Sequence, residues 1–137
     1  MAFTIRRATY YYASVRDELG AAYGVLSQLA ALGVDLLAFT AVPSGSSLAQ
    51  FALFPADPNK LVAEARSANL ALDGPYHAVL VQGDDELGAL AEVHKQLADA
   101  GIDVYASSGV TDGRGTFGYV IYVREGQFEH AASALGL

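Results

Sequence analysis

Two short segments of the sequence have the residue types needed to hold a small anion. The run Asp-Glu-Leu-Gly-Ala occurs at residues 17–21 and again at residues 85–89, and each copy precedes apolar residues at the three- and four-residue spacing of an amphipathic helix. Backbone N–H groups at a helix N-terminus bind a carboxylate favourably, because they point toward it and the helix dipole is positive there. Gly20 and Gly88 would let such a ligand approach the backbone closely. The sequence therefore predicts two matching sites for a carboxylate.

Two aspartates complete this candidate site. Asp35 and Asp103 are predicted to lie at the start of the strands that follow these helices, where each could accept a hydrogen bond from an ammonium group. Simpler interpretations stay open: Asp17 and Asp85 are good helix N-caps without any ligand, and the later aspartates could make only local turn hydrogen bonds. The candidate ligand-binding residues are Asp17, Glu18, Leu19, Gly20, Asp35, Asp85, Glu86, Leu87, Gly88 and Asp103.

No other arrangement in the sequence indicates catalysis or metal binding. The chain has no cysteine, which excludes disulfides, thiolate metal sites and a cysteine nucleophile. Its three histidines share no metal-ligand motif, and His94 is expected to be a structural residue of a helix. Residues 113–118 match the letters Gly-x-Gly-x-x-Gly, but they are predicted to connect two strands, where the phosphate-binding mechanism of that motif does not apply. We expect no catalytic residue, no metal ligand and no cofactor.

Composition and charge narrow the class of protein. The chain has 137 residues, of which 53% are hydrophobic and 17% are charged, and this suits a compact folded protein. Acidic residues outnumber basic ones by 15 to 8, the net charge is −7, and the basic residues are scattered, so neither nucleic acid nor an anionic membrane is an expected partner. The N-terminal residues lack a signal-peptide pattern, and no uncharged apolar run approaches the roughly 18 residues of a membrane span. We therefore expect a cytoplasmic protein.

The elements that position the candidate site follow from an internal repeat. A shift of 68 residues (85 minus 17) aligns residues 17–45 with residues 85–113 without a gap, and it pairs Gly33 with Gly101. A repeat of this length that occurs twice indicates two copies of one supersecondary unit. The first helix of each copy is predicted to begin at or near Asp17 or Asp85 and to end at the paired glycine, because glycine commonly follows the last residue of a helix.

Each copy is predicted to contain the same order of strands and helices. The fold class is α+β, with two ferredoxin-like βαββαβ units that have antiparallel sheets and both helices on one face. The units are expected at residues 1–73 and 74–137. The other predicted elements are strands at 9–15, 34–42, 48–54, 76–82, 102–110 and 116–123, second helices at 57–69 and 125–135, and a short last strand at 70–72 whose counterpart is absent or very short.

These features together resemble a known family. Two ferredoxin-like units, each with an Asp-x-x-Gly turn into a helix and a Gly-hydrophobic-Asp step into the next strand, are similar to tandem ACT-domain proteins. In this chain the marks are residues 17–20 with 33–35 and residues 85–88 with 101–103, and the Asp57-Pro58 start of a second helix is similar as well. The resemblance covers nearly the whole chain. It implies an amino-acid-binding regulatory protein, whose ligand often lies at an interface between two units.

The expected function is therefore that of a non-catalytic sensor. The resemblance implies that the chain binds an amino acid or related small metabolite at the candidate residues and regulates an enzyme in trans. A ligand-free interaction protein is one alternative. Another is a small metal-dependent enzyme of paired α+β repeats, similar to glyoxalases, for which the available ligands are His77, His94, Glu129 and His130.

A homodimer is also expected from the apolar content of the strands. Two helices per copy cannot readily cover all of these side chains, and uncovered sheet surface is usually buried against another chain. The residues concerned are Phe3, Ile5, Tyr10, Tyr12, Phe39, Phe51 and Tyr119.

Overall fold

The structure consists of two α+β units, one for each copy of the repeat. The computed structural model describes residues 3–84 and 88–137. The first unit comprises Thr9–Tyr76, and the second unit comprises Met1–Ala8 together with His77–Leu137. Strands β1 (Phe3–Arg16) and β4 (Asp73–Asp84) each contribute residues to both units. The expected division between residues 73 and 74 follows the repeat in the sequence, whereas each compact unit also includes part of β1 and part of β4.

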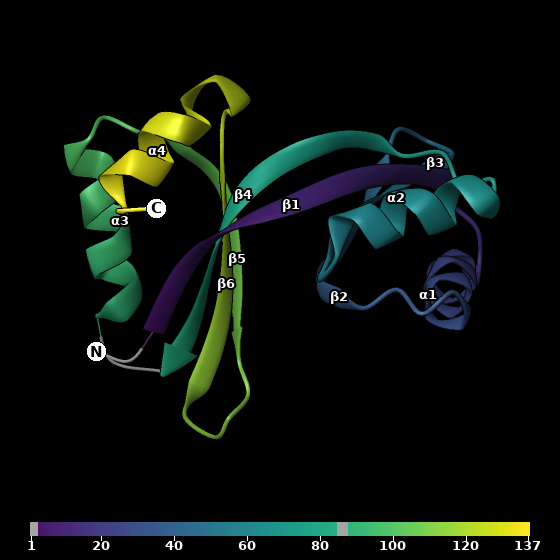
Figure 1. The fold of residues 1–137 in the computed structure, drawn as a ribbon, viewed down its shortest axis with the longest axis horizontal. Helices are drawn as coiled ribbons and strands as arrows, with labels where there is room; N and C mark the ends of the chain where they lie inside the picture. Colours follow the sequence, from purple (N-terminus) through teal and green to yellow (C-terminus); the bar gives the residue numbers. More distant parts are fainter. Residues whose placement is uncertain (1–2, 85–87) are drawn as a thin grey trace. The chain divides into compact units, whose positions relative to one another are not determined.

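The first unit contains a small antiparallel sheet with the strand order β2-β3-β1. Its core lies between this sheet and two helices, and it includes Leu29, Leu53 and Leu61, which are almost entirely buried. After β1 the chain forms α1 (Ala21–Ala31), β2 (Leu36–Ser44), β3 (Leu48–Pro55) and α2 (Pro58–Ser67) (Figure 1).

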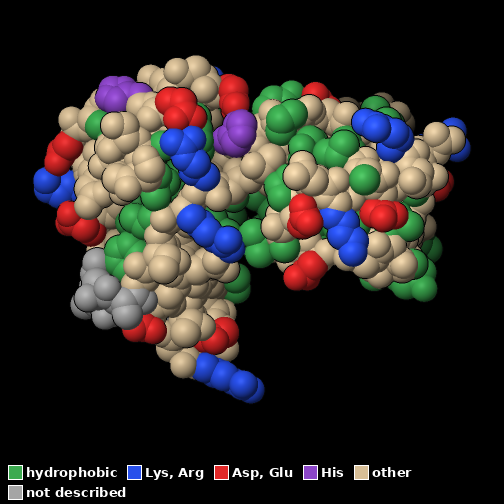
Figure 2. All heavy atoms as spheres, viewed as in Figure 1, with side chains coloured by type: hydrophobic (Ala, Val, Ile, Leu, Met, Phe, Trp, Pro, Cys, Tyr) green, Lys and Arg blue, Asp and Glu red, His purple; other side chains and the backbone are tan. Residues whose placement is uncertain are grey.

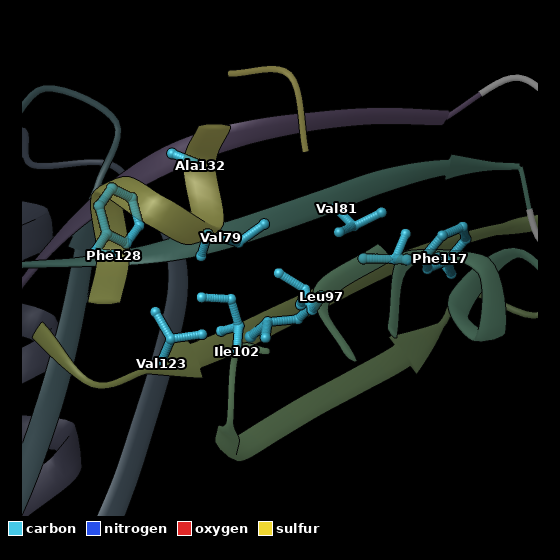
Figure 3. Packing of buried hydrophobic residues seen from close by; sticks show 11 residues of the cluster. Val79, Val81, Leu97, Ile102, Phe117, Val123, Phe128 and Ala132 are labelled. Carbon is cyan, nitrogen blue, oxygen red and sulfur yellow. The ribbon is translucent and has the colours of Figure 1, made fainter. Parts of the chain in front are cut away.

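The second unit repeats this arrangement with the strand order β4-β6-β5. After β4 the chain forms α3 (Ala89–Asp99), β5 (Val104–Thr111), β6 (Thr116–Val123), a 3₁₀ turn (Glu125–Gln127) and α4 (Phe128–Ala134). The core lies between the sheet and the helices. Figure 3 shows its labelled members, which are Val79, Val81, Leu97, Ile102, Phe117, Val123, Phe128 and Ala132.

The structure confirms the repeat predicted from the sequence. Shifting the bounds of α1 and β3 by 68 residues gives the bounds of α3 and β6 without any difference. The irregularities in strand pairing also correspond, because a shift in register falls between Leu36 and Ala38 in one copy and between Val104 and Ala106 in the other. The α+β fold with two βαββαβ units is therefore confirmed.

Three predicted helix boundaries are confirmed in atomic detail. At the end of α1 the Gly33 N–H donates to Ala30 O at 3.0 Å and the Val34 N–H donates to Leu29 O at 2.9 Å, which is a Schellman motif. Gly101 ends α3 with the corresponding bonds. Asp57 caps α2 by accepting a hydrogen bond from the Lys60 N–H at 3.3 Å, with a proline in the first turn.

Two predicted elements are corrected. Residues 70–72 do not form a strand, because the chain is irregular there and β4 begins at Asp73. The helix predicted at 125–135 is shorter, since a 3₁₀ turn precedes the α4 helix. Strands β1 and β4 are both longer than predicted, and the first residues of β1 belong to the second unit, where Thr4 Oγ1 donates to Gln82 O at 3.3 Å.

Residues 113–118 lie at the β5–β6 hairpin, as predicted. Asp112 organises this turn by accepting hydrogen bonds from the Arg114 N–H at 2.7 Å and the Thr116 N–H at 3.2 Å. The Thr116 hydroxyl also donates to it, and these bonds lower the pKa of the Asp112 carboxyl below its usual value. The glycines of this run therefore serve a strand turn and do not precede a helix.

Acidic and basic side chains are interspersed over the face of the molecule shown in Figure 2. None of the helices in residues 3–84 and 88–137 has the length and hydrophobicity needed to cross a membrane.

Candidate functional site

The candidate site begins at the turns that precede α1 and α3. Gly20 and Gly88 are the N-cap residues of these helices, and their φ angles are 85° and 86°. The expected side-chain cap at Asp17 is therefore wrong, because the N-cap of α1 lies three residues later, at Gly20. The reason is the left-handed glycine, which closes a tight turn before the helix begins. Asp85, Glu86 and Leu87 lie outside the described residues.

Both helix starts are open at their first turn. No side chain of the described residues caps α1 or α3, so some of the first-turn N–H groups are left for water or a ligand. A Cβ atom built on Gly20 or Gly88 would meet nothing within 4 Å. Asp17, Glu18 and Leu19 are all exposed beside the first of these glycines. The turn therefore has room for a small molecule, with donors and two carboxylates beside it.

The two later aspartates lie at the other end of the helices. Asp35 and Asp103 follow the glycines that end α1 and α3, and both side chains are exposed. Each helix has 11 residues, which corresponds to a length of about 16 Å. Within one unit the structure therefore does not bring the turn and the aspartate together, and a single amino acid cannot reach both.

A pocket adjoins the first turn of α3. It has a volume of about 250 Å³ and lies between that turn and the β5–β6 hairpin. Its apolar lining includes Leu90, Val110 and Phe117, and its hydroxyl groups belong to Thr111 and Tyr119. An apolar wall with a few polar groups is typical of small-molecule sites. The pocket therefore extends the candidate site from the turn onto the sheet.

Sequence reasoning missed a chain of hydrogen bonds beside this pocket. His94 Nε2 lies 2.7 Å from the Tyr119 hydroxyl, which lies 2.8 Å from Ser107 Oγ. Gly109 makes room for the tyrosine, because a Cβ there would come within 2.5 Å of the Tyr119 ring. His94 is half-buried and packs in the structure, as expected of a structural residue.

The first copy has apolar residues at the corresponding positions. Phe39 and Phe51 take the places of Ser107 and Tyr119, and their rings pack at a centroid distance of 5.3 Å. Leu26 takes the place of His94. The signal that could have found this polar group was the set of positions at which the two aligned copies differ, rather than those at which they agree.

Three of the four residues available to the metal-enzyme alternative, His77, His94 and Glu129, have other partners. Arg7 donates two hydrogen bonds to the Glu129 carboxylate at 2.8 and 2.9 Å, and this contact lowers the pKa of Glu129. His77 Nδ1 lies 3.3 Å from Glu125 Oε1, and His94 bonds to Tyr119. Within the described ranges, no three His, Cys, Asp or Glu side chains are grouped to hold a metal ion.

Comparison with known proteins places the fold. No protein-family model and no curated protein matches the chain. A protein from Bacteroides thetaiotaomicron matches with a TM-score of 0.75 and 16% identity, over 98% of this chain and 88% of the other. The regulatory subunit of aspartate kinase from Thermus thermophilus, in a ligand-free form, matches with a TM-score of 0.64 and 14% identity, over 99% and 95%.

A third solved structure has the same extent. The regulatory subunit of aspartate kinase from Thermus flavus matches with a TM-score of 0.62 and 15% identity, over 99% of this chain and 95% of the other. The identities are low, so these likenesses concern the fold. The chain has the tandem ACT-like fold that its sequence motifs indicated.

Proposed function

We propose that this chain is a non-catalytic regulatory module that binds an amino acid or a related small metabolite. The observation that carries the proposal is the pair of uncapped helix starts at Gly20 and Gly88, both open to a ligand. Two solved proteins of the same fold and nearly the same extent are described as regulatory subunits of aspartate kinase. This supports a module that acts on a separate enzyme, and a location in the cytoplasm is part of the proposal.

The proposed ligand places its carboxylate at the first-turn N–H groups of α3. Its side chain then enters the adjoining pocket, whose walls favour an apolar amino acid. By the repeat, Asp85 and Glu86 are the acidic residues for the ammonium group, as Asp17 and Glu18 are in the first copy. Leu19, Leu87, Asp35 and Asp103 remain in the proposed site, but within one unit the aspartate cannot reach a ligand that is bound at the turn.

The first test is a screen of the twenty amino acids. We expect at least one apolar amino acid to raise the melting temperature, because a ligand at about a hundred times its Kd stabilises the fold by about 2.7 kcal/mol. In ¹H–¹⁵N NMR spectra the same amino acid should shift the amide signals of Ala89 and Leu90. If no amino acid raises the melting temperature, the ligand-free interaction protein becomes the better interpretation.

A matched pair of variants locates the site. Val110→Asp places a negative charge on the rim of the pocket at an exposed position, and we expect it to weaken binding about tenfold or more, because it removes an apolar contact and repels the carboxylate of the ligand. The control is Val42→Asp, at the corresponding exposed position of the first copy, which should leave the shifts at Ala89 and Leu90 unchanged. Equal binding by parent and Val110→Asp would place the site elsewhere.

The proposal also includes a homodimer, but its interface is placed on a helix and not on the strands from which the sequence predicted it. None of the seven strand residues that suggested uncovered apolar surface is exposed, and Tyr10 and Phe51 are buried. Exposed apolar side chains instead occur on α1, where Tyr23 is 77% exposed and Leu26 lies on the same face. Helix α1 carries no charged residue, so two copies of this acidic chain could meet there without repulsion.

We expect light scattering at micromolar concentration to return twice the chain mass of 14.3 kDa. Tyr23→Lys should give the single-chain mass, because a cation on this face opposes close contact between two copies. Tyr105→Lys changes an exposed tyrosine of the second unit and should leave the dimer intact. A parent protein with the mass of one chain would contradict the dimer.

A further inference from the structure

A second cavity lies within the first unit, away from the turns described above. It has a volume of about 450 Å³ and is bounded by β1, by α2 and by the segment that leads into β4. Apolar side chains of Val62, Leu70 and Leu72 form much of its wall. The volume is within the range of pockets that hold small molecules. The residues predicted as a short strand at 70–72 therefore form one side of this cavity instead.

Tyr11 contributes a hydroxyl-bearing side chain to the lining of this cavity. The residue is only 8% exposed, and its ring lies against Gly74, where a Cβ would come within 2.9 Å of the ring. No residue in the described ranges forms a hydrogen bond with its hydroxyl. Among the described residues, the side-chain polar atom that is closed to solvent and lacks a hydrogen-bond partner is Gln127 Oε1, not the Tyr11 hydroxyl. The Tyr11 hydroxyl is therefore still reached by solvent. A tyrosine as buried as this one usually has a hydrogen-bond partner, so this hydroxyl is available to a ligand.

Arg66 provides the charge of this cavity. It lies in the last turn of α2 and lines the cavity, and no carboxylate in the described ranges forms an ion pair with it. A cation in the last turn of a helix interacts favourably with the helix dipole, and this accounts for a basic residue at position 66. It does not account for the position of Arg66 beside the apolar side chains of the cavity. Within the part of the chain that the structure describes, no acidic side chain lines the cavity. Although the chain has a net charge of −7, the charge at this cavity is therefore positive.

We propose that this cavity binds an apolar monocarboxylate. The carboxylate pairs with the Arg66 guanidinium and accepts a hydrogen bond from the Tyr11 hydroxyl, while the hydrocarbon part contacts Leu70, Leu72 and Val62. Because no acidic group is present to meet an ammonium, the cavity discriminates against amino acids. The proposal is therefore independent of the amino-acid site at the helix turns, and either one can fail without the other.

Three closely related compounds test the ligand class. We expect 3-phenylpropanoate to bind with a Kd at or below about 1 mM and to shift the amide signals of Ala65, Leu70 and Gly74 in NMR spectra. Its neutral amide, 3-phenylpropanamide, lacks the charge, and phenylalanine adds an ammonium, so both should bind at least about tenfold more weakly. Equal binding of the amide or of phenylalanine would overturn the proposal, as would the lack of a saturable shift with 3-phenylpropanoate.

Two variants test the polar groups. Arg66→Gln should weaken binding of 3-phenylpropanoate about tenfold or more, because it removes an ion pair, and Tyr11→Phe should weaken it by about three- to tenfold, because it removes one hydrogen bond from a neutral donor to the carboxylate. The control is Arg114→Gln in the β5–β6 turn, which removes the same charge and should change nothing. Unchanged melting temperatures and amide spectra establish that the variants fold. Equal binding by Arg66→Gln and Arg114→Gln would contradict the assigned role of Arg66.

Discussion

Replacing Leu97 with alanine is expected to lower the free energy of unfolding by about 2–5 kcal/mol. Its side chain is 0% exposed in the core of the second unit, so truncation removes apolar contacts and leaves a cavity that close-packed neighbours fill only in part. Leu29 takes the corresponding place in the first unit and is 1% exposed. We therefore expect Leu29→Ala to have a loss in the same range. Denaturation by urea, followed by circular dichroism, measures both.

Leu26→Ala is the matched control for these core variants. Leu26 lies on the same helix as Leu29 but is 37% exposed, so the same truncation should cost less than about 1 kcal/mol. If Leu26→Ala destabilised the protein as much as Leu29→Ala, the assignment of the buried face of α1 would be incorrect. Leu29 and Leu97 occupy the same position in the two aligned copies, so similar losses on truncation would also support the repeat.

Two glycines of α1 are expected to respond to alanine with opposite signs. Both have open space around the position of a Cβ, so the difference lies in the backbone alone. Gly20 has a φ of 85°, and an alanine there should lower stability by about 1–2 kcal/mol because its Cβ clashes in the left-handed region. Gly24 lies inside the helix without a positive φ, and alanine there should raise stability by about 0.5–1 kcal/mol.

The comparison can be made by thermal or urea denaturation of the two single variants. Gly20→Asn provides a further check, because asparagine tolerates the left-handed region better than alanine does, so it should cost less than Gly20→Ala. Destabilisation of similar size by Gly20→Ala and Gly24→Ala would contradict the turn geometry on which the candidate site depends.

Most of the fold could be predicted because its signals are local and occur twice. The glycines at 33 and 101 end helices through their own backbone geometry, and Asp57-Pro58 starts a helix with groups a few residues apart. Because the two copies align, each helix and strand predicted in one copy, apart from the short strand at 70–72, has a predicted counterpart in the other. The strand predicted at 76–82 leaves out the turn-forming residues Asp73, Gly74 and Pro75, but β4 includes them. Whether a proline is tolerated in a strand depends on which N–H groups the neighbouring strand requires, and the sequence alone does not give this.

The candidate site could be predicted only in part. The sequence indicates the residue types at the turns. Local propensity favours Asp17 as the cap of the first helix, but α1 begins after Gly20, which adopts a left-handed conformation. The separation of the turn from Asp35 was already implicit in the sequence, because the predicted helix lies between them and a helix rises by about 1.5 Å per residue. The His94, Tyr119 and Ser107 group comes from three different elements, so it required the tertiary structure.

The way in which β1 and β4 are divided between the units affects the order of folding during synthesis. The first unit is a continuous stretch, Thr9–Tyr76, so all of its residues are available once the ribosome has released residue 76. The second unit needs residues 3–8 as well as the C-terminal residues, and a further 61 residues (137 minus 76) must still be made. At about 5–20 residues per second, this takes roughly 3–12 s. During that time the first residues of β1 wait for the rest of their unit: Thr4 and Arg6 bond to Gln82, which follows soon after residue 76, whereas Arg7 bonds to Glu129, which follows much later.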